Sequence, residues 1–151
     1  MSAKPRPGEF EMSKINVGRV LLGGFATGFV IIVFEFFLNG VLLHNRMEAD
    51  FKRMNLTPPG GGFAAYAVVT SFVLGIVAVL VYSMIRSRLG PGPKTALITA
   101  LLIWFCVYAY SGVINMMLIS VPPKLILLIL LWGIIEYPVA ILIGAAIYKE
   151  T

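Results

Sequence analysis

Two glutamates lie deep inside apolar stretches of the sequence, Glu35 and Glu136. An ionised carboxylate in the hydrocarbon of a bilayer costs several kcal/mol or more, so such residues usually face a bundle interior or water. The nearest basic residue before Glu35, Arg19, is sixteen residues away, about 24 Å along a helix. We therefore expect at least one of the two carboxyls to be protonated, and to be hydrogen-bonded to Asn39, Asn115 or the other carboxyl.

Other polar side chains reach similar depths. Counted at about 1.5 Å per residue from the ends of the predicted helices, Glu35 lies about 12 Å and Glu136 about 16 Å inside the membrane. The predicted polar intramembrane cluster consists of Glu35, Asn39, Thr70, Ser71, Ser111, Asn115 and Glu136. Three interpretations of it stay open: a neutral network that fixes helix register, a proton or cation site, and a contact with a partner subunit.

The elements that position these side chains are predicted from composition. Of the 151 residues, 59% are hydrophobic and 13% are charged, whereas a soluble domain is about half apolar and about a quarter charged. This excludes a soluble globular enzyme and a disordered chain, and the single cysteine, Cys106, excludes a disulfide scaffold. The net charge of +5 in so apolar a chain indicates a membrane orientation signal rather than nucleic-acid binding.

Four apolar stretches are each long enough to cross a bilayer core about 30 Å thick. Eight of the nine prolines lie outside these stretches, where they mark the connections. The sequence therefore predicts an all-α, polytopic membrane protein with four transmembrane helices in an up-down bundle. The helices are predicted over residues 16–43, 63–85, 95–119 and 125–148, in a transmembrane domain of residues 16–148 preceded by an N-terminal tail of residues 1–15.

The connections differ in character. The segments 86–93 and 120–124 are short and proline-rich, which forces their helices to be antiparallel neighbours. The first connection carries Met47, Phe51 and Met54 at positions i, i+4 and i+7, with charged residues between them. This pattern predicts a short amphipathic helix on the membrane surface, with a solvated loop as the alternative.

Basic residues are unevenly distributed between the two sides. Eight lysines and arginines lie on the side of both termini and the second connection, and four lie on the other side. Because cytoplasmic segments carry the excess of basic residues, we expect the tail and both termini to be cytoplasmic.

Small residues form stripes on several helices, and Gly24 and Gly28 have the GxxxG spacing that lets two backbones approach closely. We expect these stripes to pack inside the bundle, with a homodimer seam as the alternative. Pro138 should kink the fourth helix two residues after Glu136. The predicted helix-packing residues are Gly24, Gly28, Ala67, Ser71, Gly75, Gly133, Ala140 and Gly144.

No catalytic, metal-binding or nucleotide-binding motif occurs in the sequence. We therefore predict a protein that is not an enzyme, with no metal and no cofactor. His44 could ligate a haem or pigment metal, but contact with lipid headgroups is the favoured interpretation. Most of the tryptophans and tyrosines, Tyr108 among them, are interpreted as packing residues.

Three segments carry a resemblance to known proteins: INVGRVLLGG near the start, EFFLNGVLL before a methionine-rich short helix, and PPKLILLILLWGIIEYPVAILIGAAIYKE at the end. On these segments the chain resembles small bacterial four-helix integral membrane proteins of unknown function. The resemblance implies the bacterial inner (cytoplasmic) membrane and the four-helix topology, and it assigns no activity and no site residues.

Two functions are compatible with these features. The first is an accessory or scaffolding subunit of a larger membrane complex, for which a respiratory or photosynthetic assembly is a natural host. The alternative is a small oligomeric transporter, channel or ion sensor that uses the intramembrane glutamates. The expected partners are the lipid bilayer and other membrane subunits or further copies of the chain, and no nucleic acid.

Overall fold

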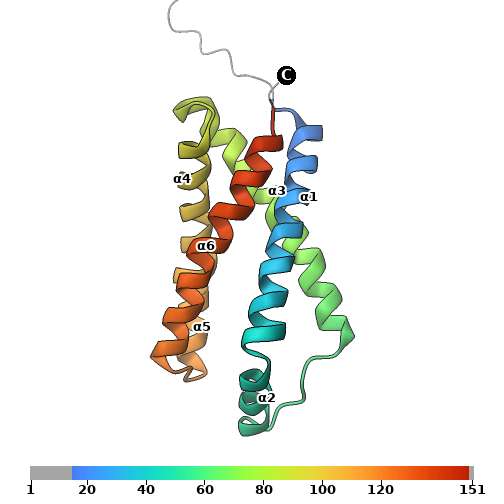
Figure 1. Cartoon of the computed structure of the whole chain (residues 1–151), viewed down its shortest axis with the longest axis vertical. Coiled ribbons are helices and arrows are strands. Elements are labelled where there is room, and N and C mark those ends of the chain that lie inside the picture. The colour runs from blue at the N-terminus through green and yellow to red at the C-terminus, as the bar shows by residue number, and fades with distance from the viewer. Residues whose placement is uncertain (1–14, 150–151) are drawn as a thin grey trace, which may run out of the picture.

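The computed structural model describes residues 15–149, so the predicted tail lies outside the described residues except for Ile15. The fold is all-α, with four long apolar helices packed together and a short helix between the first and second (Figure 1). The predicted fold class is therefore confirmed. In chain order the elements are α1 (Val17–Glu35), the π-helical η1 (Phe36–Leu42), α2 (His44–Arg53), α3 (Gly61–Leu89), α4 (Pro93–Trp104), the π-helical η2 (Phe105–Gly112), α5 (Val113–Leu118) and α6 (Pro123–Ile147).

These elements form four spans that are long and apolar enough to cross a membrane: Val17–Leu42, Gly61–Leu89, Pro93–Leu118 and Pro123–Ile147. The first combines α1 with η1, and the third combines α4, η2 and α5. The protein is thus a multi-pass membrane protein by helix length and hydropathy. Residues 44–53, for which a loop was the alternative, form the short helix α2.

Local sequence signals set the helix ends. Asn16 caps α1, where its side-chain oxygen accepts a hydrogen bond of 3.1 Å from the backbone N–H of Arg19. Pro93 and Pro123 occupy the first positions of α4 and α6, where a missing N–H is tolerated. Helix α3 ends at Leu89 and is capped by Gly90, whose φ of 83° lies in the left-handed region that favours glycine.

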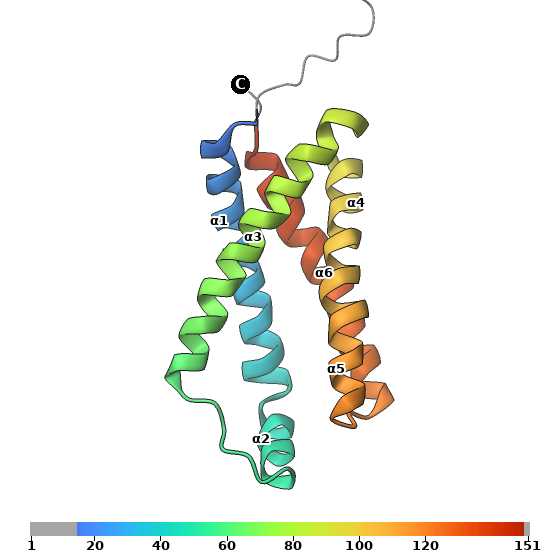
Figure 2. The ribbon, with the colours of Figure 1, turned by 180° about the vertical axis from the view of Figure 1, so that it is seen from behind.

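The helices do not pack evenly along their length. Helix α1 packs against both α3 and α6, and α4 runs beside α6 (Figures 1 and 2). Helix α3 crosses α1 obliquely, and all its buried residues lie at or after Gly75. We call the end of the bundle that holds Ile15, Gly90 and Tyr148 the terminal end, and the opposite end the α2 end. The tightly packed core lies in the half nearer the terminal end, and the half nearer the α2 end is looser.

Glycines allow the close approach of α1 and α3. An added Cβ on Gly24 would lie 2.5 Å from the Cα of Ile76, and one on Gly28 would lie 2.7 Å from the Cα of Phe72. From the other side, an added Cβ on Gly75 would meet the backbone of Gly24 and Gly28. The GxxxG pair is therefore occupied by contacts within the chain, and its face is not open for a second copy.

A second seam joins α1 to α6. An added Cβ on Gly23 would lie 2.7 Å from the carbonyl oxygen of Gly144. Beside it the hydroxyl of Thr27 donates to the carbonyl oxygens of Gly23 at 3.0 Å and of Ala140 at 3.2 Å. Thr27 and Ala140 are both fully buried. These contacts fix α6, and with it Glu136, against α1.

Helix α6 continues as one helix through Pro138. Proline has no backbone N–H, so the carbonyl of Ile134 lacks its usual partner four residues later. Gly133, one turn before Glu136 along α6, faces the third span, where an added Cβ would lie 2.9 Å from Trp104 and 3.0 Å from Tyr108. The absence of a side chain at Gly133 therefore lets Tyr108 lie against α6.

Candidate functional site

Three helical spans bring the two intramembrane glutamates together around one tyrosine. The hydroxyl oxygen of Tyr108, on η2, lies 2.6 Å from Oε1 of Glu35 on α1. The same oxygen lies 3.0 Å from Oε2 of Glu136 on α6. The glutamates are thus linked through a phenol.

Asn39 extends this link toward the α2 end. Its side-chain Nδ2 donates to Oε2 of Glu35 at 2.6 Å and to the backbone carbonyl of Glu35 at 3.1 Å. The two residues are four apart in the sequence, so they lie one turn apart on the same side of the helix. We call Asn39, Glu35, Tyr108 and Glu136 the carboxyl–phenol network.

Burial increases along the network. Asn39 and Glu35 are half-buried, Tyr108 is 7% exposed and Glu136 is 0% exposed. The second carboxyl oxygen of Glu136, Oε1, is also buried and has no hydrogen-bond partner within the described residues. A buried polar atom without a partner is expensive, and it costs far more on a charged group than on a neutral one. The environment of Glu136 therefore suits a neutral carboxylic acid.

Proton counting leads to the same assignment. A neutral phenol has one O–H proton, so Tyr108 can donate to only one of its two carboxyl neighbours. The other contact is a hydrogen bond only if that carboxyl is protonated and donates to the phenol oxygen. Glu35 also accepts from Asn39 and is the less buried of the two, so it suits the ionised form. When both contacts of the Tyr108 oxygen are hydrogen bonds, Glu136 donates to Tyr108, and Tyr108 donates to Glu35.

Aromatic rings surround the network. Tyr137 is 2% exposed and meets the ring of Tyr108 edge-on, with centroids 5.6 Å apart. Trp132 of α6 stacks on Phe37 with centroids 6.0 Å apart and meets Phe34 edge-on at 5.6 Å, so it ties α6 to the first span beside Glu35. These apolar rings lower the local dielectric, which strengthens every hydrogen bond in the network.

The network lies where two helices change their winding. Residues Phe36–Leu42, which follow Glu35 directly, and Phe105–Gly112, which include Tyr108, are π-helical. Wider winding shifts the direction in which the following side chains point, and π-helical turns in α-helices are frequent at functional sites. Both changes of winding thus coincide with residues of the carboxyl–phenol network.

The structure brings three of the seven predicted cluster residues together: Glu35, Asn39 and Glu136. Thr70 is exposed and donates to carbonyls of its own helix, at Tyr66 and Ala67. Asn115 is exposed and donates to the carbonyl of Ser111. Ser71 is half-buried in the α1–α3 seam near Gly28.

Sequence reasoning missed one member of the network, Tyr108, which was interpreted as a packing residue. Its ring does pack against Tyr137, but its hydroxyl joins both glutamates. A signal for this was present in the sequence. Tyr108 is eleven residues from the predicted helix end at Ile119, so it lies about 16 Å deep, the same depth as Glu136.

A cavity of about 370 Å³ opens at the α2 end, between the first connection and the outer turns of α5 and α6. Its walls include Met47 and Phe51 of α2 and Met54 directly after it, opposite Met116 and Leu125. Asn39 is also part of its lining. The cavity therefore reaches the first residue of the carboxyl–phenol network.

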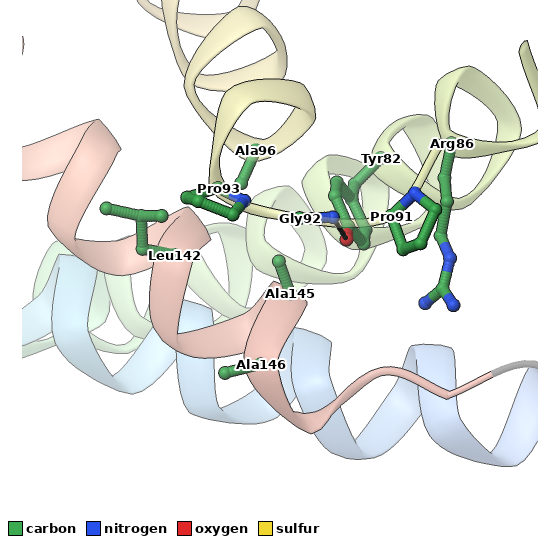
Figure 3. A pocket seen from close by; sticks show the side chains of 9 residues that line it. All are labelled: Tyr82, Arg86, Pro91, Gly92, Pro93, Ala96, Leu142, Ala145 and Ala146. Carbon is green, nitrogen blue, oxygen red and sulfur yellow. Dashed lines mark hydrogen bonds between the residues drawn. The ribbon is translucent and has the colours of Figure 1, made fainter. Parts of the chain in front are cut away.

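A second cavity, of about 270 Å³, lies at the terminal end between Tyr82, Pro93 and Ala145 (Figure 3). Beside it the guanidinium of Arg86 lies 5.4 Å from the ring centre of Tyr148 and donates to the carbonyl of Tyr148. No residue of the carboxyl–phenol network lines this cavity. The contacts beside this cavity hold the ends of α3 and α6 together.

His44 begins α2, and its Nε2 lies 3.9 Å from Oε1 of Glu48 on a well-exposed part of that helix. Within residues 15–149, no three histidine, cysteine, aspartate or glutamate side chains are close enough together to hold a metal ion.

The chain matches no protein-family model, and neither a curated protein nor a solved structure is significantly similar to it.

Proposed function

We propose that the protein is an intramembrane ion sensor or transporter that binds and releases a proton at Glu136. The observation that carries this proposal is the position of the Tyr108 hydroxyl, 2.6 Å from Glu35 and 3.0 Å from Glu136. A phenol between an acid and a carboxylate can accept a proton from one and donate its own to the other. The network can therefore move a proton between Glu136 and Glu35 without a large movement of either helix.

The proposal needs neither an enzyme activity nor a cofactor. The groups that take part are two carboxyls and a phenol, which exchange protons and form no covalent intermediate. It includes an orientation in the bacterial inner membrane with both termini cytoplasmic and the α2 end outside. The support for that orientation is the excess of eight basic residues over four on the side of the termini.

Infrared spectroscopy of the reconstituted protein tests the proposal. A protonated carboxyl absorbs at a frequency separate from that of a carboxylate, so the band of Glu136 can be followed while the pH is raised. We expect one protonated-carboxyl band that disappears in Glu136→Gln and persists in the matched variant Glu48→Gln, on the exposed face of α2. If the spectra of the wild type and Glu136→Gln have the same carboxyl bands at every pH, the proposal fails.

A second candidate is an accessory subunit of a larger membrane complex. The observation in its favour is the low burial of the spans, because only 22–33% of each apolar window is buried within the chain. The remaining apolar surface has room for lipid and for other subunits. Purification in a mild detergent distinguishes the two candidates: stoichiometric co-migrating proteins favour the accessory subunit, and a homogeneous preparation whose proton response vanishes in Glu136→Gln favours the sensor or transporter.

A further inference from the structure

We infer that Glu136 exchanges its proton with one side of the membrane only, the side of α2, through the cavity beside Asn39. This inference rests on the proposed function, since it assumes that Glu136 is the proton site. It goes further because it assigns the route and the direction of exchange.

The α2 end has a cavity that leads to the network and is lined by mostly apolar side chains with three polar ones, Asn39, Arg46 and Asp50. The cavity between α2 and the outer turns of α5 and α6 measures about 370 Å³, room for about ten water molecules at their liquid volume. Arg46 and Asp50 are part of its lining, so charged groups as well as apolar ones face the space. Asn39 lies in the wall of the cavity and is hydrogen-bonded to Glu35. A proton that reaches Glu35 from this cavity has only Tyr108 between it and Glu136.

The opposite direction is blocked by packing. On the terminal side of Glu136, α6 presents Ala140 and Ile141, both 0% exposed, and α3 presents Val79, also 0% exposed. Gly23 and Gly144 bring the backbones of α1 and α6 into contact at the same level. The side chains and backbones of α1, α3 and α6 are thus closely packed on this side of Glu136.

Three buried threonines of this packed region donate to backbone carbonyls. Thr27 donates to the carbonyls of Gly23 and Ala140. Thr99 donates to the carbonyl of Thr95, and Thr95 donates to that of Gly90. These hydroxyls bond backbone carbonyls and not one another, so they form no chain of hydrogen bonds toward the terminal-end cavity. The lining residue of that cavity nearest to Glu136 along α6 is Leu142, six residues after Glu136, about 9 Å along the helix.

The titratable groups around Glu136 are few. Glu35 faces it from α1 and Tyr108 from η2, and Tyr137 is its neighbour on α6. Within residues 15–149, α3 and α4 place no titratable group beside it, because Tyr82 and Arg86 of α3 line the terminal-end cavity and Lys94 stands at the first turn of α4. Of these groups, Tyr108 is hydrogen-bonded to Glu136 and connects it to Glu35. Asn39, which is hydrogen-bonded to Glu35, lines the α2-end cavity.

One-sided exchange makes the protein a sensor of the pH on the α2 side rather than a transporter. Net transport would need a second route from Glu136 to the terminal end. The packed contacts of α1, α3 and α6 occupy that path, so the protonation of Glu136 follows the proton concentration of one compartment.

The test measures Glu136 in vesicles of known orientation. Cysteines are introduced in a Cys106→Ser background at Lys124 on the α2 side or at Arg88 on the terminal side, both exposed. An impermeant biotin reagent then captures each vesicle on an infrared-transparent surface with the chosen side facing the bath, while a trapped buffer holds the internal pH. We expect a bath pH step to change the Glu136 band in Lys124→Cys vesicles and to leave it unchanged in Arg88→Cys vesicles.

A cavity-filling variant tests the route itself. Met116→Trp should fill part of the α2-end cavity and slow the response of the Glu136 band by about tenfold, because the indole would occupy the space next to Asn39. Met84→Trp adds the same ring at a position on α3 that is 57% exposed and lines neither cavity, so its response should be unchanged.

The outcomes separate the two proposals. If the Glu136 band responds from the terminal side, or equally from both sides, one-sided exchange is wrong while Glu136 remains the proton site. If neither orientation contains a pH-dependent band that is lost in Glu136→Gln, the proposed function itself fails.

Discussion

Glu35 and Glu136, on the first and last spans of the bundle, are joined through a single phenol. The Tyr108 oxygen lies 2.6 Å from one carboxyl and 3.0 Å from the other, and it comes from a third span. One side chain thus connects three helices at the depth where an unpaired charge would be most costly. Its removal is the most direct probe of the network.

Tyr108→Phe keeps the ring contact with Tyr137 and removes the hydroxyl. We expect the free energy of unfolding to fall by about 1–3 kcal/mol, because the buried Glu136 loses its hydrogen-bond partner. The infrared band of the Glu136 carboxyl should move to higher frequency as that bond is lost. Thermal unfolding in detergent and infrared difference spectra provide the two measurements.

Tyr110→Phe is the matched control for Tyr108→Phe. Tyr110 also lies on η2 but is 64% exposed. Loss of its hydroxyl in Tyr110→Phe should change neither the thermal unfolding nor the infrared spectrum appreciably. An equal loss of stability in the two variants would mean that the network contributes nothing beyond ring packing.

Gly75→Ala should separate α1 from α3. The added Cβ would meet the carbonyl oxygen of Gly24 and the backbone N of Gly28, and would lie 2.8 Å from the Cα of Gly28. None of these atoms can move without shifting a helix, so we expect a loss of about 1–3 kcal/mol in the free energy of unfolding. Gly62→Ala, on the same helix with open space around it, should leave stability nearly unchanged. Comparable midpoints for both variants in a denaturation series would contradict the close approach.

Thr27→Val probes the seam between α1 and α6. The substitution keeps the volume and removes a hydroxyl that donates to Gly23 and Ala140 at a fully buried position. We expect a loss of about 0.5–1.5 kcal/mol, measured by reversible unfolding in mixed micelles. Thr70→Val makes the same change at an exposed position where the hydroxyl bonds its own helix, and it should lower stability less. A larger loss in Thr70→Val would show that the seam is not held by this hydrogen bond.

Tyr148→Leu probes the anchoring of the last helix. The Arg86 guanidinium lies 5.4 Å from the ring centre of Tyr148, and the rings of Tyr148 and Tyr82 meet edge-on with centroids 6.0 Å apart. We expect a stability loss of about 1–2 kcal/mol, together with faster proteolysis of the C-terminal end of α6, because both contacts disappear. Tyr66→Leu, at a tyrosine that is 67% exposed, serves as the comparison and should leave the proteolysis rate unchanged. Equal rates for the two variants would show that the terminal end is held in another way.

Much of the fold could be predicted because bilayer insertion leaves few alternatives. The backbone must satisfy its own hydrogen bonds in lipid, so apolar stretches of this length become helices and the prolines fall between them. The stripe of Met47, Phe51 and Met54 likewise identified α2. The same reasoning could not find the two π-helical segments, since Phe36–Leu42 and Phe105–Gly112 have the composition of ordinary apolar helix.

The candidate site was predictable only in part. Depth and polarity identified Glu35, Asn39 and Glu136, because these properties depend on position along a helix. Whether Thr70 or Asn115 faces the same interior depends on the rotation of each helix about its axis, which tertiary packing decides. Tyr108 was misread because a tyrosine ring packs like an apolar residue while its hydroxyl remains available.

The oblique course of α3 gives the protein a dependence on bilayer thickness. Its 29 residues span about 43 Å, well beyond a hydrocarbon core of about 30 Å. A helix longer than the membrane accommodates the excess by tilting, so a thinner bilayer increases the tilt of α3. Because α3 packs on α1 from Ser71 onward and none of its residues before Gly75 is buried, the added tilt swings the turns before Ser71 away from the bundle. Lipid composition thus acts on the looser half of the molecule and leaves the packed half in place.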